Sequence, residues 1–226
     1  MWQRILKHEL RLPLLTLACA SALGCVLVAA RILLSGRAQQ LYLVWNLFLA
    51  WVPLLLALRV EALHESNTIR GWRFWITAAA WLLFFPNAPY IFTDLSHLTL
   101  ATKSRWWTDL VVILLFAVIG LVLAFISLHR LHAVVSRRHG GPAGWAFVFG
   151  AAFLSGFGVY LGRFERWNSW DVVTNPLGLL ADSLNWMDRH SAKFTVLFGL
   201  FLLTAYALLY SLTRLTPAGP TVSKKG

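Results

Sequence analysis

The stretch FPNAPYIFTDLSHL, Phe85–Leu98, determines how this chain can fold. It ends an apolar run that begins at Phe74. Its two prolines, Pro86 and Pro89, each lack a backbone donor and disfavour helix in the residue before them. A helix in lipid cannot simply stop, because each carbonyl left without a donor costs several kcal/mol in hydrocarbon. We therefore expect the break to lie at the membrane interface, or to face protein or water.

The composition of the chain is typical of a membrane protein. Of the 226 residues, 58% are hydrophobic and 13% are charged, whereas about 25% is usual for a soluble domain. The formal net charge is +11. The basic residues cluster between apolar runs, which suits anionic lipid headgroups better than nucleic acid. Membrane lipids are therefore the expected partners, and no nucleic-acid-reading motif is present.

Six apolar runs predict six membrane-spanning helices. Each is close to the 17–25 residues that a bilayer requires, the third only if it includes its broken end. The runs are 12–34, 41–60, 74–85, 110–128, 145–161 and 194–212. The prediction is an all-α polytopic membrane bundle, with one transmembrane domain over 1–213 and a polar tail over 214–226. Charged links are expected over 59–73 and 129–144, and a polar loop, with room for one short helix, over 93–109.

A further helix is predicted to lie flat in the membrane interface. Residues 177–190 are amphipathic and too polar to cross the bilayer. Asn175 can cap this helix, and Pro176 suits its first position. We expect it to cover the ends of the bundle as a partial lid.

The orientation follows from the basic residues. The side that holds both termini carries more Lys and Arg than the other side, and the richer side is normally cytoplasmic. The prediction is a protein of the cytoplasmic (inner) membrane with both termini in the cytoplasm and the double-proline stretch outside it.

A second polar cluster, Gly162–Asp171, follows the fifth run. The third and fifth runs end on the same side of the membrane whichever way the protein is inserted. The two polar clusters can therefore meet. If the protein is an enzyme, we expect Asp94, His97, Arg163 and Asp171 to converge at a pocket that water can reach.

Several of these side chains are candidates for chemistry. Asp94 and His97 are three apart, share a helix face and, with Asp171, are candidate acid–base groups. The pair would need a third ligand, from Asp171, Glu165 or His190, to hold a metal, and no metal site is predicted. The structural alternative is a short helix that Thr93 caps, with Asp94 at its positive end and His97 hydrogen-bonded to a nearby group.

Four residues are candidates for binding a substrate: Asn87, Arg163, Arg166 and Asn168. The two arginines are expected to share a face and hold a phosphate or carboxylate. Their alternative is contact with lipid headgroups or pairing with nearby carboxylates. The Asn87 amide is expected to bond to carbonyls that the prolines leave without donors.

Gly158 and Gly162 in the fifth run form a small-xxx-small pair. This spacing lets two helix backbones approach closely. It predicts either packing within the chain or a homodimer through this face.

The runs Phe85–Leu98 and Gly162–Asp171 resemble the two signatures of a bacterial membrane family catalogued as domain of unknown function 1361. The resemblance extends roughly from the second span to the sixth. It implies a multi-pass bacterial inner-membrane protein. It implies no activity, substrate or cofactor, so the cofactor stays open.

Three functions remain compatible with the sequence. The first is a non-catalytic membrane protein whose extracytoplasmic polar site binds a lipid headgroup or a protein partner. The second is a membrane enzyme acting on a lipid-linked or phosphorylated substrate at the outer face, with Asp94 or His97 moving a proton. The third is a small-solute transporter that uses the broken third span.

Overall fold

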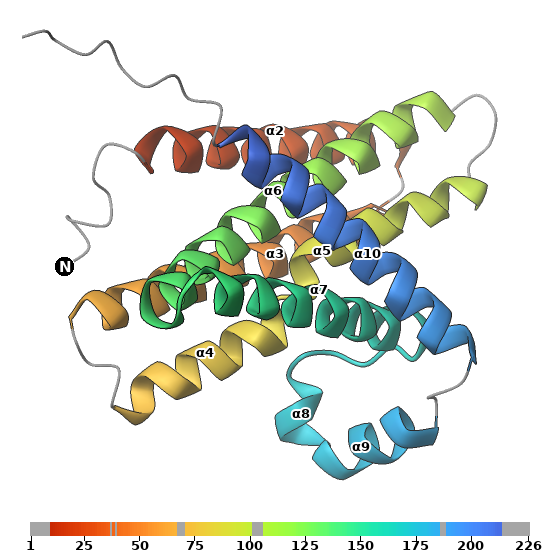
Figure 1. Ribbon diagram of the computed structural model, residues 1–226. Coiled ribbons are helices and arrows are strands. Elements are labelled where there is room, and N and C mark those ends of the chain that lie inside the picture. The colour runs from red at the N-terminus through yellow and green to blue at the C-terminus, as the bar shows by residue number, and fades with distance from the viewer. Residues whose placement is uncertain are drawn as a thin grey trace, which may run out of the picture.

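The computed structural model describes residues 10–36, 38, 40–66, 71–100, 106–185 and 189–213. Within these ranges the chain forms helices and no strand, which confirms the all-α prediction. The helices are α2 (Arg11–Ser35), α3 (Leu41–Glu65), α4 (Trp72–Phe84), α5 (Asn87–Tyr90), the 3-10 helix η1 (Ile91–Leu100), α6 (Trp106–His139), α7 (Gly141–Phe164), α8 (Asp171–Thr174), α9 (Pro176–Asn185) and α10 (Arg189–Leu212). The long helices form a bundle, and the short α8 and α9 lie apart at one end of it (Figure 1).

Six segments of the described chain are long and apolar enough to cross a membrane. The third of them, Trp72–Leu98, contains α4, α5 and most of η1. With 13 residues, α4 alone is about 20 Å long, too short for a hydrocarbon core of about 30 Å. The third span thus needs its broken end, as predicted, and the protein is a multi-pass membrane protein.

The predicted links 59–73 and 129–144 are partly wrong, because α3 and α6 continue into them. With 34 residues, α6 is about 50 Å long and exceeds the hydrocarbon core. Glu61 of α3 accepts a hydrogen bond from Arg130 of α6 at 3.4 Å, and Arg137 lies 3.6 Å from the same oxygen. These ion pairs join the two helices where polar residues replace apolar ones.

The predicted polar loop 93–109 contains the short helix that the sequence allowed, whereas its last residues, from Trp106, already belong to α6. Ile91–Leu100 forms η1, in which Ile91 is fully buried and Asp94 is 1% exposed. A Cβ atom at Gly120 of α6 would lie 3.2 Å from the Ile91 side chain. The close approach of α6 therefore holds this segment against the bundle.

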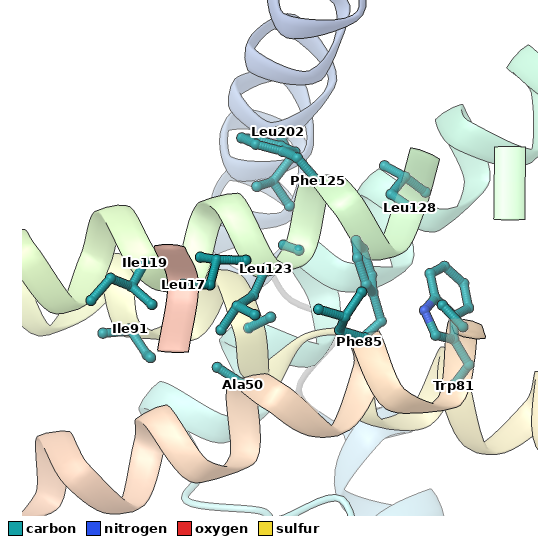
Figure 2. Packing of buried hydrophobic residues seen from close by; sticks show 14 of the residues in the cluster. Leu17, Ala50, Trp81, Phe85, Ile91, Ile119, Leu123, Phe125, Leu128 and Leu202 are labelled. Carbon is teal, nitrogen blue, oxygen red and sulfur yellow. The ribbon is translucent and has the colours of Figure 1, made fainter. Parts of the chain in front are cut away.

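Aromatic and apolar side chains around the break form part of the core. Phe85 and Ile91 are buried, and Figure 2 shows Ile91 next to Ile119 of α6. Trp81 stacks on Phe85 with ring centroids 4.7 Å apart and donates a hydrogen bond of 2.6 Å to Ser127 of α6. The break consequently faces protein, one of the environments that the sequence allowed.

Two glycines of α7 make room for the broken segment. A Cβ atom at Gly158 would lie 2.6 Å from Pro86, and one at Gly162 would lie 3.3 Å from the Tyr90 ring. The small-xxx-small face thus serves packing within the chain. A homodimer through this face stays a prediction.

The helix predicted over 177–190 corresponds to α9 in the described residues. It begins at Pro176 and is capped as predicted, since the Asn175 side-chain oxygen accepts a hydrogen bond from Gly178 N at 3.2 Å. The described part of the helix reaches Asn185, and residues 186–188 lie outside the described residues. His190 lies in α10, the sixth span, and not in the interfacial helix as predicted.

Candidate functional site

Asn87 and Ser169 link the two polar clusters directly. The Asn87 amide donates one hydrogen bond to the Phe84 carbonyl oxygen (3.0 Å) and one to the Ser169 hydroxyl oxygen (2.8 Å). The Ser169 hydroxyl donates to the carbonyl oxygen of Leu83 (3.1 Å). Both carbonyls belong to the last turn of α4, whose main-chain oxygens lack helical donors because the helix ends at Phe84. The predicted role of Asn87 is confirmed, with Ser169 as a second donor.

Asp94 of η1 forms an ion pair with Arg163 near the end of α7. Arg163 Nη1 lies 3.1 Å from Asp94 Oδ1, and their side chains are 17% and 1% exposed. The second carboxylate oxygen accepts a hydrogen bond from the Asn46 amide of α3 at 2.9 Å. Both oxygens of this buried carboxylate are therefore occupied by groups from other helices.

His97 completes this cluster. Its Nε2 lies 3.2 Å from Arg163 Nη2, and its ring contacts the Tyr42 ring at 5.1 Å between centroids. Because a guanidinium can only donate, Nε2 must accept. Arg163 also bonds to the hydroxyl of Ser96. The predicted convergence of Asp94, His97 and Arg163 is confirmed.

The prediction that Asp171 joins this cluster is wrong. Its carboxylate accepts hydrogen bonds from the Asn168 main chain (2.7 Å), the Asn168 amide (3.2 Å) and the Thr174 hydroxyl (3.2 Å). These partners all lie within three residues along the chain. Asp171 thus fixes the turn that leads into α8, and it has no place beside Asp94.

The prediction that Arg163 and Arg166 share a helical face is also wrong. The α7 helix ends at Phe164, and Arg166 adopts a left-handed backbone with φ 59°. Trp167 N donates to the Leu161 carbonyl oxygen at 3.2 Å, so the chain folds back on the end of α7 around a left-handed residue, a position that glycine usually takes. Arg166 is exposed, whereas Arg163 is held by Asp94.

A cavity of about 220 Å³ lies beside the ion pair. It is formed by α3, the broken segment, α7, the turn after α7, α8 and α9. Its lining consists of Trp45, Asn46, Leu49, Leu83, Pro86, Asn87, Tyr90, Gly158, Leu161, Gly162, Trp167, Asn168, Ser169, Val172 and Leu179. Of the predicted site residues, Asn87 and Asn168 line the cavity, whereas Asp94, His97, Arg163, Arg166 and Asp171 do not.

Asn46 is the functional-site residue that the sequence analysis missed. It lines the cavity and bonds to Asp94, so it connects the cavity with the ion pair. The signal was present, because Asn46 is the one amide in the apolar run 41–58. A polar side chain inside a membrane span normally has a partner within the bundle.

The residues suggested as a third metal ligand lie elsewhere. Asp171 bonds to Asn168, and the His190 ring contacts the rings of Tyr160 and Phe164. Across the part of the chain that the structure describes, no three His, Cys, Asp or Glu side chains are grouped as metal ligands. Arg163 takes the place beside Asp94 that another ligand would need.

Comparison with known proteins identifies one relationship. The model of the family described as "Protein of unknown function (DUF1361)" matches residues 45–205, more than half of the chain. The match includes both polar clusters and every residue that lines the cavity. No curated protein and no solved structure matches the chain.

Proposed function

We propose that this multi-pass membrane protein, which belongs to the DUF1361 family, binds the headgroup of a membrane lipid in the cavity beside Asn46 and Asn87. One observation carries the proposal: a small cavity with three asparagines in its lining opens among exposed apolar side chains at one end of the bundle. The volume of about 220 Å³ is below the roughly 300–1,000 Å³ of pockets that enclose drug-sized ligands. It suits a headgroup whose tails remain outside.

Exposed apolar side chains lie on both sides of the cavity. On α3, Trp45 is 53% exposed and Phe48 is 60% exposed. On the other side, Val173 of α8 and Leu177 of α9 are each 80% exposed. Apolar surface of this kind is stable against lipid tails. A molecule with a polar head and apolar tails therefore matches both parts of this region.

The proposed location is the inner membrane of a bacterium, with one transmembrane domain over 1–213 and a polar tail after it. The excess of Lys and Arg on the side of the termini supports cytoplasmic termini. With both termini in the cytoplasm, α7 runs outward and ends beside the cavity, and α10 runs back toward the cytoplasm. The cavity then opens on the extracytoplasmic side.

Catalysis by Asp94 or His97 has less support than binding. Asp94 is 1% exposed, and both of its oxygens already have partners. A catalytic carboxylate must reach its substrate, yet neither Asp94 nor His97 lines the cavity. Transport has less support because the other five candidate spans are each a single helix over the described residues. A matching broken segment is usual in transporters.

The test is a pair of variants on one helix. Leu179→Trp places a larger side chain in the cavity lining, whereas Leu177→Trp makes the same change two residues away on the exposed surface. Wild type and both variants are purified in detergent, and the lipids that copurify are measured by mass spectrometry.

We expect a lipid class that copurifies with wild type and with Leu177→Trp and is depleted from Leu179→Trp. Thermal unfolding of the three proteins after delipidation controls for misfolding. Equal lipid content in all three folded proteins would overturn the proposal.

A further inference from the structure

We propose that the headgroup bound in the cavity is uncharged and carries several hydroxyl groups, as the sugar of a glycosyl lipid does. This inference rests on the proposed function, because it names the chemical class of the ligand for the same cavity. Two observations support the inference: which lining side chains form hydrogen bonds with the protein, and which of their donors and acceptors have no partner in the described residues.

The three asparagines of the cavity donate their amide hydrogens to the protein. Asn46 and Asn168 donate to the carboxylates of Asp94 and Asp171, at 2.9 and 3.2 Å. Asn87 donates both of its hydrogens to oxygen atoms, at 3.0 and 2.8 Å. A carboxylate can only accept from an amide, and so can a main-chain carbonyl. The chemistry of the partners therefore fixes which end of each amide faces the protein.

The side-chain carbonyl oxygens of these three asparagines accept no hydrogen bond from the described residues. The oxygens of Asn46 and Asn87 are not among the buried polar atoms without a partner, and Asn168 is an exposed residue. Each is thus an acceptor that a ligand can reach. Three such acceptors favour a ligand that donates hydrogen bonds and disfavour a phosphate, whose oxygens only accept.

Aromatic side chains supply the complementary donors. The indole N–H groups of Trp45 and Trp167 and the hydroxyl of Tyr90 make no hydrogen bond with the described part of the chain. A ligand in this cavity thus meets both donors and acceptors. A hydroxyl group can donate and accept at once, whereas an ammonium group only donates. Aromatic ring faces also pack against the C–H groups of a sugar ring.

Charge points to the same class of ligand. The cavity lining described above contains no Asp, Glu, Lys, Arg or His. Arg163 and Asp94 lie nearby but pair with each other. An isolated charge removed from water without a partner is costly, so an uncharged headgroup is favoured over an anionic one.

The experiment compares headgroups at constant acyl chains. Monoglucosyl-diacylglycerol, phosphatidylglycerol and phosphatidylethanolamine are each titrated into the delipidated protein, and intrinsic tryptophan fluorescence reports binding. Soluble methyl glucoside is a fourth probe. Tyr90→Phe removes only a hydroxyl that has no partner in the described chain, so we expect unchanged thermal unfolding without lipid. We expect this variant to bind the glucosyl lipid about 3- to 10-fold more weakly.

Tight binding of the glucosyl lipid, weakened by both Tyr90→Phe and Leu179→Trp, is the expected result. A phospholipid that binds better than the glucosyl lipid, with the same sensitivity to Leu179→Trp, would overturn this inference and leave the proposed function standing. Methyl glucoside that binds as tightly as the lipid would show a site for soluble sugars instead. Binding of every lipid unaffected by Leu179→Trp would overturn both proposals.

Discussion

Arg163 and Asp94 lie 69 residues apart in the chain, and their side chains form an ion pair of 3.1 Å between α7 and η1. The pair joins the two polar clusters on one side of the bundle. Since Asp94 is 1% exposed, the arginine compensates a carboxylate that has little contact with water. This relationship assigns Arg163 to the fold, whereas the sequence left open whether it binds an anion, contacts lipid headgroups or pairs with a carboxylate nearby in the chain.

Removing one member of this pair should destabilise the protein more than removing both. Arg163→Met leaves the Asp94 carboxylate buried without a cation, and we expect a loss of about 3 kcal/mol or more. Adding Asp94→Leu to the Arg163→Met variant should restore a large part of the lost stability. Thermal unfolding in detergent measures both variants. Arg138→Met, at an exposed position of α6, should change stability by less than about 0.5 kcal/mol. If Arg163→Met lost no more stability than Arg138→Met, the structural role of the ion pair would be contradicted.

Gly158 should be intolerant of even one methyl group. A Cβ atom there would lie 2.6 Å from Pro86 Cγ and 3.0 Å from Pro86 Cβ, and neither the ring nor its segment can move freely. We expect Gly158→Ala to cost about 1–3 kcal/mol through overpacking. Gly150→Ala on the same helix meets nothing within 4 Å and should be neutral or stabilising by up to about 1 kcal/mol. Similar unfolding temperatures for the two variants would argue against the close approach of α7 to the break.

Asn87 and Ser169 should be energetically coupled. Asn87→Ala leaves the Phe84 carbonyl without a donor, and Ser169→Ala does the same to Leu83, each costing about 1–3 kcal/mol. Because the two side chains share a hydrogen bond, the double variant should lose less than the sum, by about 1 kcal/mol. Thr77→Ala, at an exposed site about 15 Å away along the segment, should add to Asn87→Ala without coupling. Strict additivity of Asn87→Ala and Ser169→Ala would refute the link.

Arg166→Gly should stabilise the protein. The arginine has φ 59°, a left-handed conformation that costs a residue with a Cβ atom roughly 1–2 kcal/mol. Glycine relieves this strain, and we expect a gain of about 1 kcal/mol. Glu165→Gly is the matched control, since Glu165 has φ −97° and ψ −6° and should lose stability. A loss at both positions would mean that the Arg166 side chain makes a stabilising contact.

The two polar clusters should be labelled from the same side of the membrane. After Cys19 and Cys25 are replaced by alanine, single cysteines at Ser96, Arg166 and His139 are treated with an impermeant maleimide in intact spheroplasts. The first two should react without permeabilisation, whereas the third, at the end of α6, should react only after it. Labelling of Ser96→Cys and Arg166→Cys from opposite sides would contradict the fold. Inverted labelling of all three would reverse only the orientation.

Much of this architecture follows from local features of the sequence. Apolar runs of bilayer length predicted six crossings, and two prolines predicted the break in the third. Counting crossings predicted that the clusters around Asp94 and Arg163 lie on one side. The role of the Asn87 amide was also predictable, because prolines leave carbonyls without donors close by in the chain.

Other features depended on tertiary contacts. Asp171 bonds within its own turn, and Asn46 reaches Asp94 from a helix that the sequence predicted only as an apolar span. Which donor meets which acceptor depends on how each helix is rotated about its axis and on the residue at which α7 ends. Hydropathy and proline chemistry act over a few neighbouring residues. They determine that helices cross and where they break, whereas the packing of Gly120, Gly158 and Gly162 against the broken segment decided which polar side chains face the cavity.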